Sequence, residues 1–333
     1  MSGAEKEKIG VVLFNLGGPD SLDAVEPFLY NLFQDPDIFT FPFASLVRKP
    51  LAKFIAKRRA PKSRVYFEYM GGKSPILELT LQQADALEKK LNNGSEDKNF
   101  KVVVAMRFWK PFTQDALQSL KNEGIQKVVL LPLYPQYSYT TTRSSEKEWD
   151  AQCKKKSLSF EKVSRVSDYH RHPLYIQAVA TRIREGIARF PVEKQNQVHL
   201  LFSAHGIPLQ EVAAGDPYEK QIIESVELIR KELGNDYSHS LSYQSKVGPL
   251  KWLEPNTVAT IERLAKEEKK QILAVPISFV SDHSETLYEL KKMYGELAVG
   301  LGVEQYELMP ALNDQPLFIE CLADCVLDSK KQS

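Results

Sequence analysis

Short runs of β-branched and apolar residues alternate along this chain with stretches whose apolar residues recur every three or four positions. This alternation is typical of parallel sheets joined by crossover helices. The predicted strands are Ile9–Asn15, Lys101–Met106, Lys127–Leu133, Val198–Ser203, Ser240–Gln244 and Gln271–Phe279. The predicted helices include Ile76–Leu91, Thr113–Glu123, Pro173–Phe190, Tyr218–Leu233, Thr257–Glu268 and Leu317–Leu327. The pattern therefore predicts an α/β protein.

A weak internal repeat and the length of 333 residues together favour two domains. Each half has a strand that runs into a Gly-Pro-rich turn, Leu-Phe-Asn-Leu-Gly-Gly-Pro in the first and Leu-Phe-Ser-Ala-His-Gly-Ile-Pro in the second. We expect two similar Rossmann-like domains, 1–168 and 169–311, that face one cleft. The last helix, within 312–333, is expected to join the first domain. Chance similarity between short strands is the alternative explanation.

Charge and composition exclude several classes of protein. Forty-four basic and forty-three acidic residues give a net charge of +1, which offers no general surface for nucleic acid. The three cysteines indicate a reducing compartment, so we expect a cytoplasmic protein. No run of 18 apolar residues suits a membrane span. Gly17-Gly18-Pro19 follows a strand but lacks the G-x-G-x-x-G spacing, so no nucleotide is expected.

Two side chains with useful chemistry follow predicted strands. His205 comes after Val198–Ser203, and Glu285 follows Gln271–Phe279. Ligands bind at the carboxyl edge of a parallel sheet, where strand ends converge. An imidazole and a carboxylate there can hold a divalent metal or move protons. The alternative is that His205 packs in a loop and Glu285 charges the start of a helix.

Further acids accompany Glu285 on the predicted helix. Asp282, Glu285 and Glu289 are spaced to lie on one helical face, with His283 beside them. An exposed acidic helix start would explain the same spacing, because carboxylates there favour the helix dipole. The position directly after an apolar strand instead predicts burial.

An apolar segment with a basic fringe lies within residues 38–59. Its uncharged part, Ile38 to Val47, is too short to cross a bilayer. The fringe consists of Arg48, Lys49, Lys53, Lys57, Arg58 and Arg59. Such a lip suits the inner face of a membrane, or a flat apolar ligand that bears carboxylates. A connector packed in the core is the alternative.

Several segments together resemble the ferrochelatase family, whose members insert ferrous iron into a porphyrin. The most specific are Ser-Ala-His-Gly-Ile-Pro from Ser203, Gln-Ser-Lys-Val-Gly-Pro-Leu-Lys-Trp-Leu from Gln244, and Ser-Asp-His-Ser-Glu-Thr-Leu-Tyr-Glu-Leu from Ser281. Lys-Arg-Arg-Ala-Pro, Gly-Gly-Lys-Ser-Pro and Tyr-Pro-Gln-Tyr-Ser support them. The resemblance runs nearly from end to end.

The resemblance implies roles for individual residues. His205 and Glu285 are implied to face the metal and accept protons, and Asp282, His283 and Glu289 to continue an acidic path. The implied porphyrin-binding residues are Leu16, Arg58, Arg59, Ser74, Arg107, Phe108, Tyr137, Trp252 and Phe279. Fe²⁺ and protoporphyrin IX are then the substrates, and haem b the product. Coproporphyrin III is the alternative porphyrin.

Three departures from the family pattern bear on these implications. Phe108 stands where many relatives have tyrosine, and Lys73 replaces a glycine. The cysteine-bearing extension of some members is missing, so we expect no iron–sulfur cluster and a monomer. A chelatase for cobalt or nickel, and a non-catalytic haem carrier, are the competing functions. The acidic row counts against a carrier, which needs no proton path.

Overall fold

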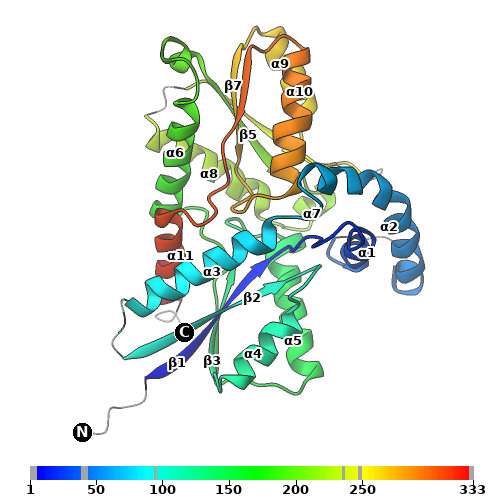
Figure 1. The fold of residues 1–333 in the computed structure, drawn as a ribbon, viewed down its shortest axis with the longest axis vertical. Helices are drawn as coiled ribbons and strands as arrows, with labels where there is room; N and C mark the ends of the chain where they lie inside the picture. Colours follow the sequence, from blue (N-terminus) through cyan, green and yellow to red (C-terminus); the bar gives the residue numbers. More distant parts are fainter. Residues whose placement is uncertain are drawn as a thin grey trace. The chain divides into compact units, whose positions relative to one another are not determined.

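The protein forms two compact units, each built on a parallel sheet (Figure 1). The structure is a computed structural model that describes residues 6–38, 44–93, 95, 97–234, 237–246 and 250–329. The first unit contains 1–133, 139–168 and 319–333, and the second contains 134–138 and 169–318. The fold class predicted from the sequence, α/β with two similar parallel-sheet domains, is confirmed.

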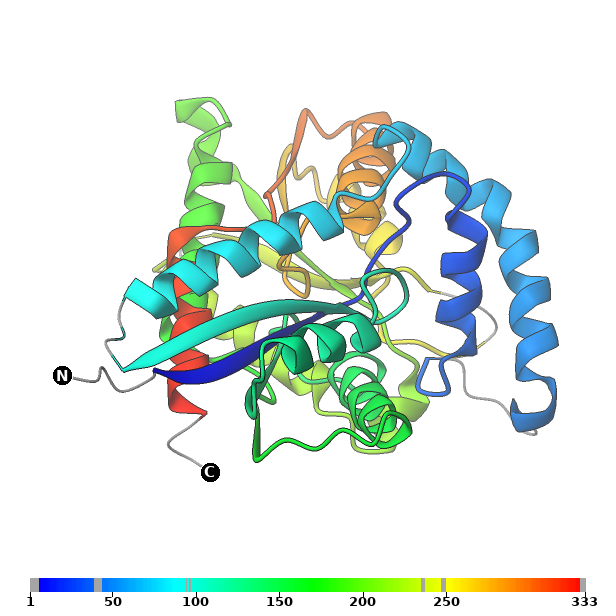
Figure 2. The ribbon, with the colours of Figure 1, turned by 60° about the horizontal axis from the view of Figure 1, so that its bottom comes forward.

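The first unit carries a sheet with the strand order β2-β1-β3-β4. Its strands are β1 (Glu7–Asn15), β2 (Lys98–Met106), β3 (Lys127–Pro132) and β4 (Lys162–Arg165). Its helices are α1 (Val25–Gln34), α2 (Ala44–Tyr69), α3 (Ile76–Asn93), α4 (Thr113–Asn122), the π-helix η1 (Tyr139–Arg143) and α5 (Ser144–Lys155). Figure 2 shows α3 on one face of this sheet, with α4 and α5 on the other.

The second unit repeats this arrangement with the order β6-β5-β7-β8. Its strands are β5 (His199–His205), β6 (His239–Gln244), β7 (Gln271–Pro276) and β8 (Gln305–Leu308). Its helices are α6 (Pro173–Ile187), the 3₁₀-helix η2 (Val192–Gln197), α7 (Leu209–Ala213), α8 (Tyr218–Glu232), α9 (Thr257–Lys266), the π-helix η3 (Glu285–Met293) and α10 (Tyr294–Gly300). The last helix, α11 (Pro316–Asp328), passes from the second unit into the first at Phe318–Ile319.

All neighbouring strands in both sheets are parallel, and both sheets have the order second-first-third-fourth. The six predicted strands and six predicted helices are all present, with shifted ends. The sequence reading missed β4 and β8, which are four-residue edge strands. Each has only one buried residue, so neither shows the apolar run by which the longer edge strand β2 was recognised.

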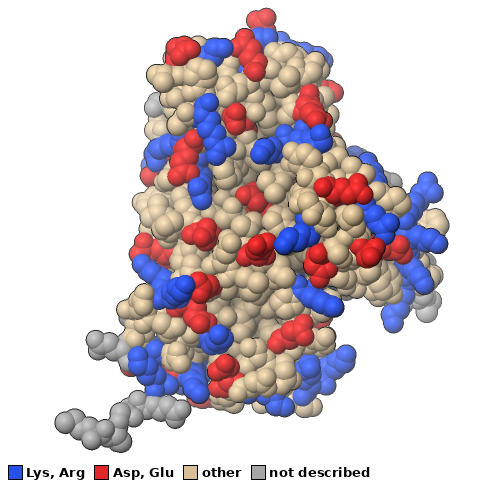
Figure 3. Space-filling model, viewed as in Figure 1, with Lys and Arg blue, Asp and Glu red and all other residues tan. Residues whose placement is uncertain are grey.

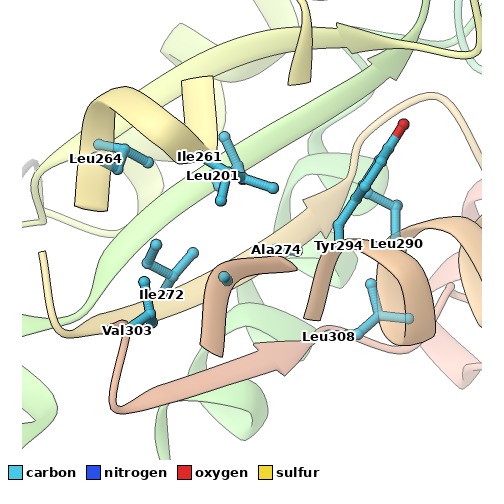
Figure 4. Close-up of a cluster of buried hydrophobic side chains, with 10 residues drawn as sticks. Leu201, Ile261, Leu264, Ile272, Ala274, Leu290, Tyr294, Val303 and Leu308 are labelled. Carbon is cyan, nitrogen blue, oxygen red and sulfur yellow. The ribbon is translucent and has the colours of Figure 1, made fainter. Parts of the chain in front are cut away.

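Each unit has its own apolar core. In the second unit, Leu201 of β5 and Ile272 of β7 pack with Ile261 and Leu264 of α9 (Figure 4). In the first unit, one cluster joins α1 to α2 through Phe28, Phe33, Ala52, Ala56 and Phe108. The small alanines of α2 let the two helices approach closely. α1 is therefore held mainly by apolar contact with α2.

The predicted lip lies partly outside the described residues, because 39–43 are not described. From Ala44 on, the segment is the start of α2 rather than a flap. α2 contains Pro50 and Pro61, which remove backbone donors, and Figure 2 shows the helix bending along its length. Among the described residues, no helix combines the length and the hydropathy needed to span a membrane.

Candidate functional site

His205 is the last residue of β5 and lies at the carboxyl edge of the second sheet. Its backbone N–H donates to the Ser278 hydroxyl at 3.0 Å, and its carbonyl accepts from the Tyr218 hydroxyl at 3.0 Å. Ser278 follows β7, which neighbours β5 in the sheet. Three elements thus fix the backbone of His205, as the strand-end position predicted.

The hydrogen bonds of the imidazole define its tautomer. Nδ1 lies 2.6 Å from the Gly206 carbonyl oxygen, which can only accept, so Nδ1 carries the proton. Nε2 of the neutral ring then presents a lone pair, and it lies 3.7 Å from Oε1 of Glu285. The side chain of His205 is 36% exposed, so Nε2 is accessible to a ligand.

Glu285 is the first residue of η3, a π-helix, in which backbone hydrogen bonds join residues five apart instead of four. Its other oxygen, Oε2, is buried and has no hydrogen-bond partner among the described residues. His283 lies nearby, with Nε2 at 3.8 Å from this oxygen and Nδ1 donating to the Ser281 carbonyl at 3.0 Å. Two imidazoles therefore turn their Nε2 atoms toward one carboxylate.

The three groups shift one another's protonation. Burial by itself raises the pKa of Glu285, but His205 and His283 outweigh it and leave the pKa below the ordinary glutamate value. Burial by itself lowers the pKa of His283, but the Glu285 carboxylate, the Ser281 carbonyl and Asp282 together raise the pKa above its ordinary value. Glu285 is thus kept as an anion in a largely apolar site.

Glu289 lies four residues beyond Glu285 on η3. Its Oε2 accepts from the Ser245 hydroxyl at 2.6 Å and from Nε2 of Gln244 at 3.2 Å. Burial, and next the charge of Glu285, raise the pKa of Glu289 above its ordinary value. Two neighbouring carboxyls with pKa values moved in opposite directions are a recurring arrangement for acid–base chemistry.

Asp282 does not continue this row. Its Oδ1 accepts from the Thr286 hydroxyl at 2.9 Å, and its Oδ2 accepts from the Asn313 amide at 2.9 Å. Asp282 thus fixes the start of η3 to the segment after β8. The predicted single face with Asp282, Glu285 and Glu289 assumed an α-helix, whereas η3 is a π-helix that begins at Glu285 and leaves Asp282 just before it.

Two aromatic rings stand beside His205. Phe279 lies 6.4 Å from its ring, and Trp252 lies 6.3 Å from it, measured between centroids. Phe279 also contacts His283, at 4.7 Å. Tyr137, which was also predicted to bind the porphyrin, belongs to the second unit and donates its backbone N–H to Oε1 of Gln221 at 2.7 Å. The rings offer an apolar wall next to the polar groups.

In the first unit, Arg107 is held by a buried acid. Its Nε donates to the Ser144 hydroxyl at 2.8 Å, and its guanidinium pairs with Asp35 at 2.9 Å. Ser144 and Asp35 are themselves hydrogen bonded. Phe108 is 1% exposed and lies in the α1–α2 core with its ring 5.0 Å from the Arg107 guanidinium carbon. Phe108 therefore packs against Arg107 from within this core.

The remaining predicted residues of the first unit lie near α1 to α3. Ser74 is 8% exposed, and its hydroxyl accepts from the N–H of Ile76 at the start of α3. A Cβ at Gly18 would lie 2.6 Å from the Cβ of Ser74, so this close approach requires glycine. Arg58 and Arg59 are exposed on α2, and the Arg59 guanidinium lies 5.6 Å from the Phe33 ring. Leu16 packs on the edge of the α1–α2 core.

Sequence reasoning missed the residues that support the site. Ser278, Tyr218 and Asp35 carry no pattern that marks a ligand or an acid–base group. Gln244 and Ser245 begin one of the segments that carry the family resemblance, but that segment did not indicate that both side chains donate to Glu289.

The arrangement can accept protons and bind a divalent cation. Two donor atoms 3.7 Å apart can both reach one ion at about 2.1 Å. One imidazole nitrogen and one carboxylate oxygen bind an ion weakly, which suits an ion that is released again rather than stored. The same Nε2 can instead take a proton and share it with Glu285.

Comparison with known proteins gives a consistent result. Residues 8–330 match the family model described as Ferrochelatase. The chain is 52% identical over 319 residues to the protein named Ferrochelatase from Aquifex aeolicus (strain VF5), which covers 96% of this chain and 98% of that one. It is 49% identical to the one from Geotalea uraniireducens (strain Rf4), with 96% and 97% covered. The solved structure "SirB from Bacillus subtilis with Fe3+" shares the fold at a TM-score of 0.57 and 9% identity, over 97% of this chain and 95% of that one.

Proposed function

Because the chain belongs to the ferrochelatase family and is therefore a metal chelatase, a lyase, we propose that it inserts Fe²⁺ into protoporphyrin IX, releases two protons and forms haem b. The observation that carries this proposal is the facing pair of His205 Nε2 and Glu285 Oε1, with Glu285 Oε2 buried and without a hydrogen bond among the described residues. Such a pair has room for a proton or an ion that arrives with the substrate.

Metallation must remove two pyrrole N–H protons and strip water from Fe²⁺. His205 accepts a pyrrole proton at Nε2, since Nδ1 already carries one. Glu285 takes the proton onward, and Glu289, whose pKa is raised, receives it next. His283 keeps Glu285 ionised until the proton arrives. In this proposal Asp282 positions η3 and does not move protons.

The porphyrin needs an apolar wall and cations for its carboxylates. Trp252 and Phe279 supply the wall near His205, and Tyr137 of the second unit adds a further aromatic contact. In the first unit Arg58, Arg59 and Ser74 bind propionates, and Leu16 adds apolar surface. Arg107 adds a cation that Asp35 and Phe108 hold in place. Packing that bends the porphyrin ring toward its metallated shape would use part of the porphyrin binding energy to lower the activation barrier for metal insertion.

The test is anaerobic incubation of the protein with Fe²⁺ and protoporphyrin IX, followed by the haem absorbance spectrum. A parallel reaction with coproporphyrin III decides the porphyrin. His239→Ala is the matched control for His205→Ala, because His239 starts β6 at the amino edge of the same sheet. Haem binding without haem formation from either porphyrin would overturn the proposal in favour of a carrier.

We further propose that the protein works as a monomer in the cytoplasm and contacts the inner face of the membrane through α2. Phe54 on this helix is 64% exposed, beside the exposed Lys53, Lys57 and Arg58. Figure 3 shows acidic and basic side chains mixed over the face in view, with lysine and arginine gathered along α2. Exposed apolar and basic groups on one helix favour an anionic lipid surface.

Vesicle flotation tests this contact. The protein should float with phosphatidylserine-containing vesicles and not with neutral ones, and Phe54→Ser should reduce the bound fraction. Leu81→Ser on α3 is the control, because it also replaces an exposed apolar side chain with serine. Equal flotation of the wild-type protein and Phe54→Ser would contradict the proposed membrane contact through α2.

A further inference from the structure

Ser245 has a backbone conformation that serine rarely adopts. It follows the last residue of β6 with φ of +66°, in the left-handed region that favours glycine and asparagine. Its hydroxyl donates to Oε2 of Glu289 at 2.6 Å. A strained non-glycine residue persists only where its surroundings fix it, and such residues gather at functional sites. Here the strain coincides with a short contact to a glutamate of the site.

Gln244, the preceding residue, acts on the same carboxylate. It is 1% exposed, and its Oε1 accepts from the Ser203 hydroxyl at 2.8 Å, which fixes the orientation of the amide. Its Nε2 therefore points away from Ser203, toward Oε2 of Glu289 at 3.2 Å and the Glu285 carbonyl at 3.3 Å.

This amide is anchored in the core of the second unit. The Ser203 hydroxyl also meets the Thr257 hydroxyl at 3.2 Å, and Thr257 meets Ser242 at 3.0 Å. Ser203, Ser242 and Thr257 are fully buried, so the chain of hydroxyls is rigid. Gln244 thereby connects a fixed polar core to both glutamates of η3.

We propose that Gln244 and Ser245 form a clamp that fixes the Glu289 carboxylate relative to Glu285, and that both are positioning residues for the chelatase reaction. The inference deepens the proposed function and rests on it. Both donors converge on Oε2, and among the described residues no hydrogen bond reaches Oε1 of Glu289. The clamp thus leaves one oxygen free to accept a proton while preventing the side chain from rotating away.

The clamp matters because proton transfer depends steeply on the distance and direction between successive groups. Glu289 has a flexible side chain with several rotamers, and its burial and the charge of Glu285 both disfavour its anion. Two donors on one oxygen select one rotamer and support the anion when it forms. Without them we expect the porphyrin to bind normally and to be metallated slowly.

Three substitutions of Ser245 separate the hydroxyl from the backbone strain. Ser245→Ala removes the donor and keeps the strained backbone, whereas Ser245→Gly removes both. Ser245→Asn tolerates the left-handed conformation and restores a donor. We expect kcat to fall about tenfold or more in both Ala and Gly variants, with the porphyrin KM within about twofold of wild type. Ser245→Asn should recover much of kcat, and Ser245→Gly should melt at a higher temperature than Ser245→Ala.

Ser157 is the matched control, because it is an exposed serine with φ of +50° at the end of α5 in the first unit. Ser157→Ala and Ser157→Gly should change the melting temperature in the same direction as the Ser245 pair and leave kcat unchanged.

The inference is overturned if Ser245→Gly, folded and porphyrin-binding, keeps wild-type kcat, or if kcat follows the melting temperature across the series. A rise in the porphyrin KM alone would also overturn it, because it would assign Ser245 to substrate binding. These results differ from failure of the proposed function, in which the wild-type protein itself makes no haem. Porphyrin binding is followed by absorbance titration without iron, so it is scored separately from activity.

Discussion

Asp282 offers a sharp test of which acids near Glu285 take part in proton transfer. Its carboxylate accepts from Thr286, from the Asn313 amide and, at 3.4 Å, from the N–H of Ala311. Asn313 in turn accepts from the N–H of Asp282 at 3.0 Å. We expect Asp282→Ala to destabilise the second unit while leaving the chemistry of the remaining folded protein largely intact.

The size of the effect follows from which donors lose their partner. The Thr286 hydroxyl retains the His283 carbonyl at 3.1 Å, so it stays paired. The Asn313 amide and the Ala311 N–H each lose a hydrogen bond to a charged acceptor, and a lost bond of this kind costs about 1–3 kcal/mol. The free energy of unfolding should fall by about 2–4 kcal/mol, which lowers the melting temperature by roughly 5–15 °C.

Thermal unfolding followed by circular dichroism gives the stability, and kcat is measured well below the lower melting temperature. Asn313→Gly is the matched variant, because glycine keeps the left-handed backbone of Asn313, φ +48°, and removes its amide. The double variant should be less destabilised than the sum of the two single ones. Unchanged melting together with a loss of kcat would refute the reasoning and return Asp282 to the proton path.

Three further predictions concern ionisable side chains of the second unit. His205→Ala should abolish haem formation while porphyrin still binds, as measured by absorbance titration; substantial residual turnover would remove His205 from the mechanism. Since burial raises the pKa of Glu289, its ionisation costs stability as the pH rises above the ordinary glutamate value, and the melting temperature of Glu289→Gln should fall less than that of the wild-type protein over the same rise in pH. Burial, and next Lys269, lower the pKa of His199 to about 4, so its protonation favours the unfolded chain. Wild-type stability should therefore drop by about 3 kcal/mol from about pH 6.5 to about pH 4, and His199→Gln should lack this drop in urea titrations.

The parts of the fold that were predictable are those set by local pattern. Central strands such as β1 and β5 are buried on both faces, so their apolar runs are conspicuous in the sequence. The cap at Asn256 was also predictable, and its side chain accepts from the N–H of Val258 at 2.9 Å.

The site was predictable in place but not in detail. A parallel sheet brings strand ends to one edge, which was enough to expect His205 near the segment after β7. The spacing of the acids was read with an α-helical period, and η3 is a π-helix, which changes the faces of all its side chains. A π-helix depends on tertiary contacts such as the one from Gln244 to the Glu285 carbonyl, and a single sequence does not display them.

Two histidines of β5 differ in how many of their ring nitrogens are already hydrogen bonded. His199 begins the strand, and both of its ring nitrogens meet serine hydroxyls, Ser238 at 2.9 Å and Ser240 at 3.0 Å. Its lone pair is therefore already used, and its charged form is disfavoured. His205 ends the same strand with one nitrogen tied to a carbonyl and the other facing Glu285. Residue type and strand membership are the same in both, so the number of nitrogens left without a hydrogen bond decides which imidazole can take a proton or an ion.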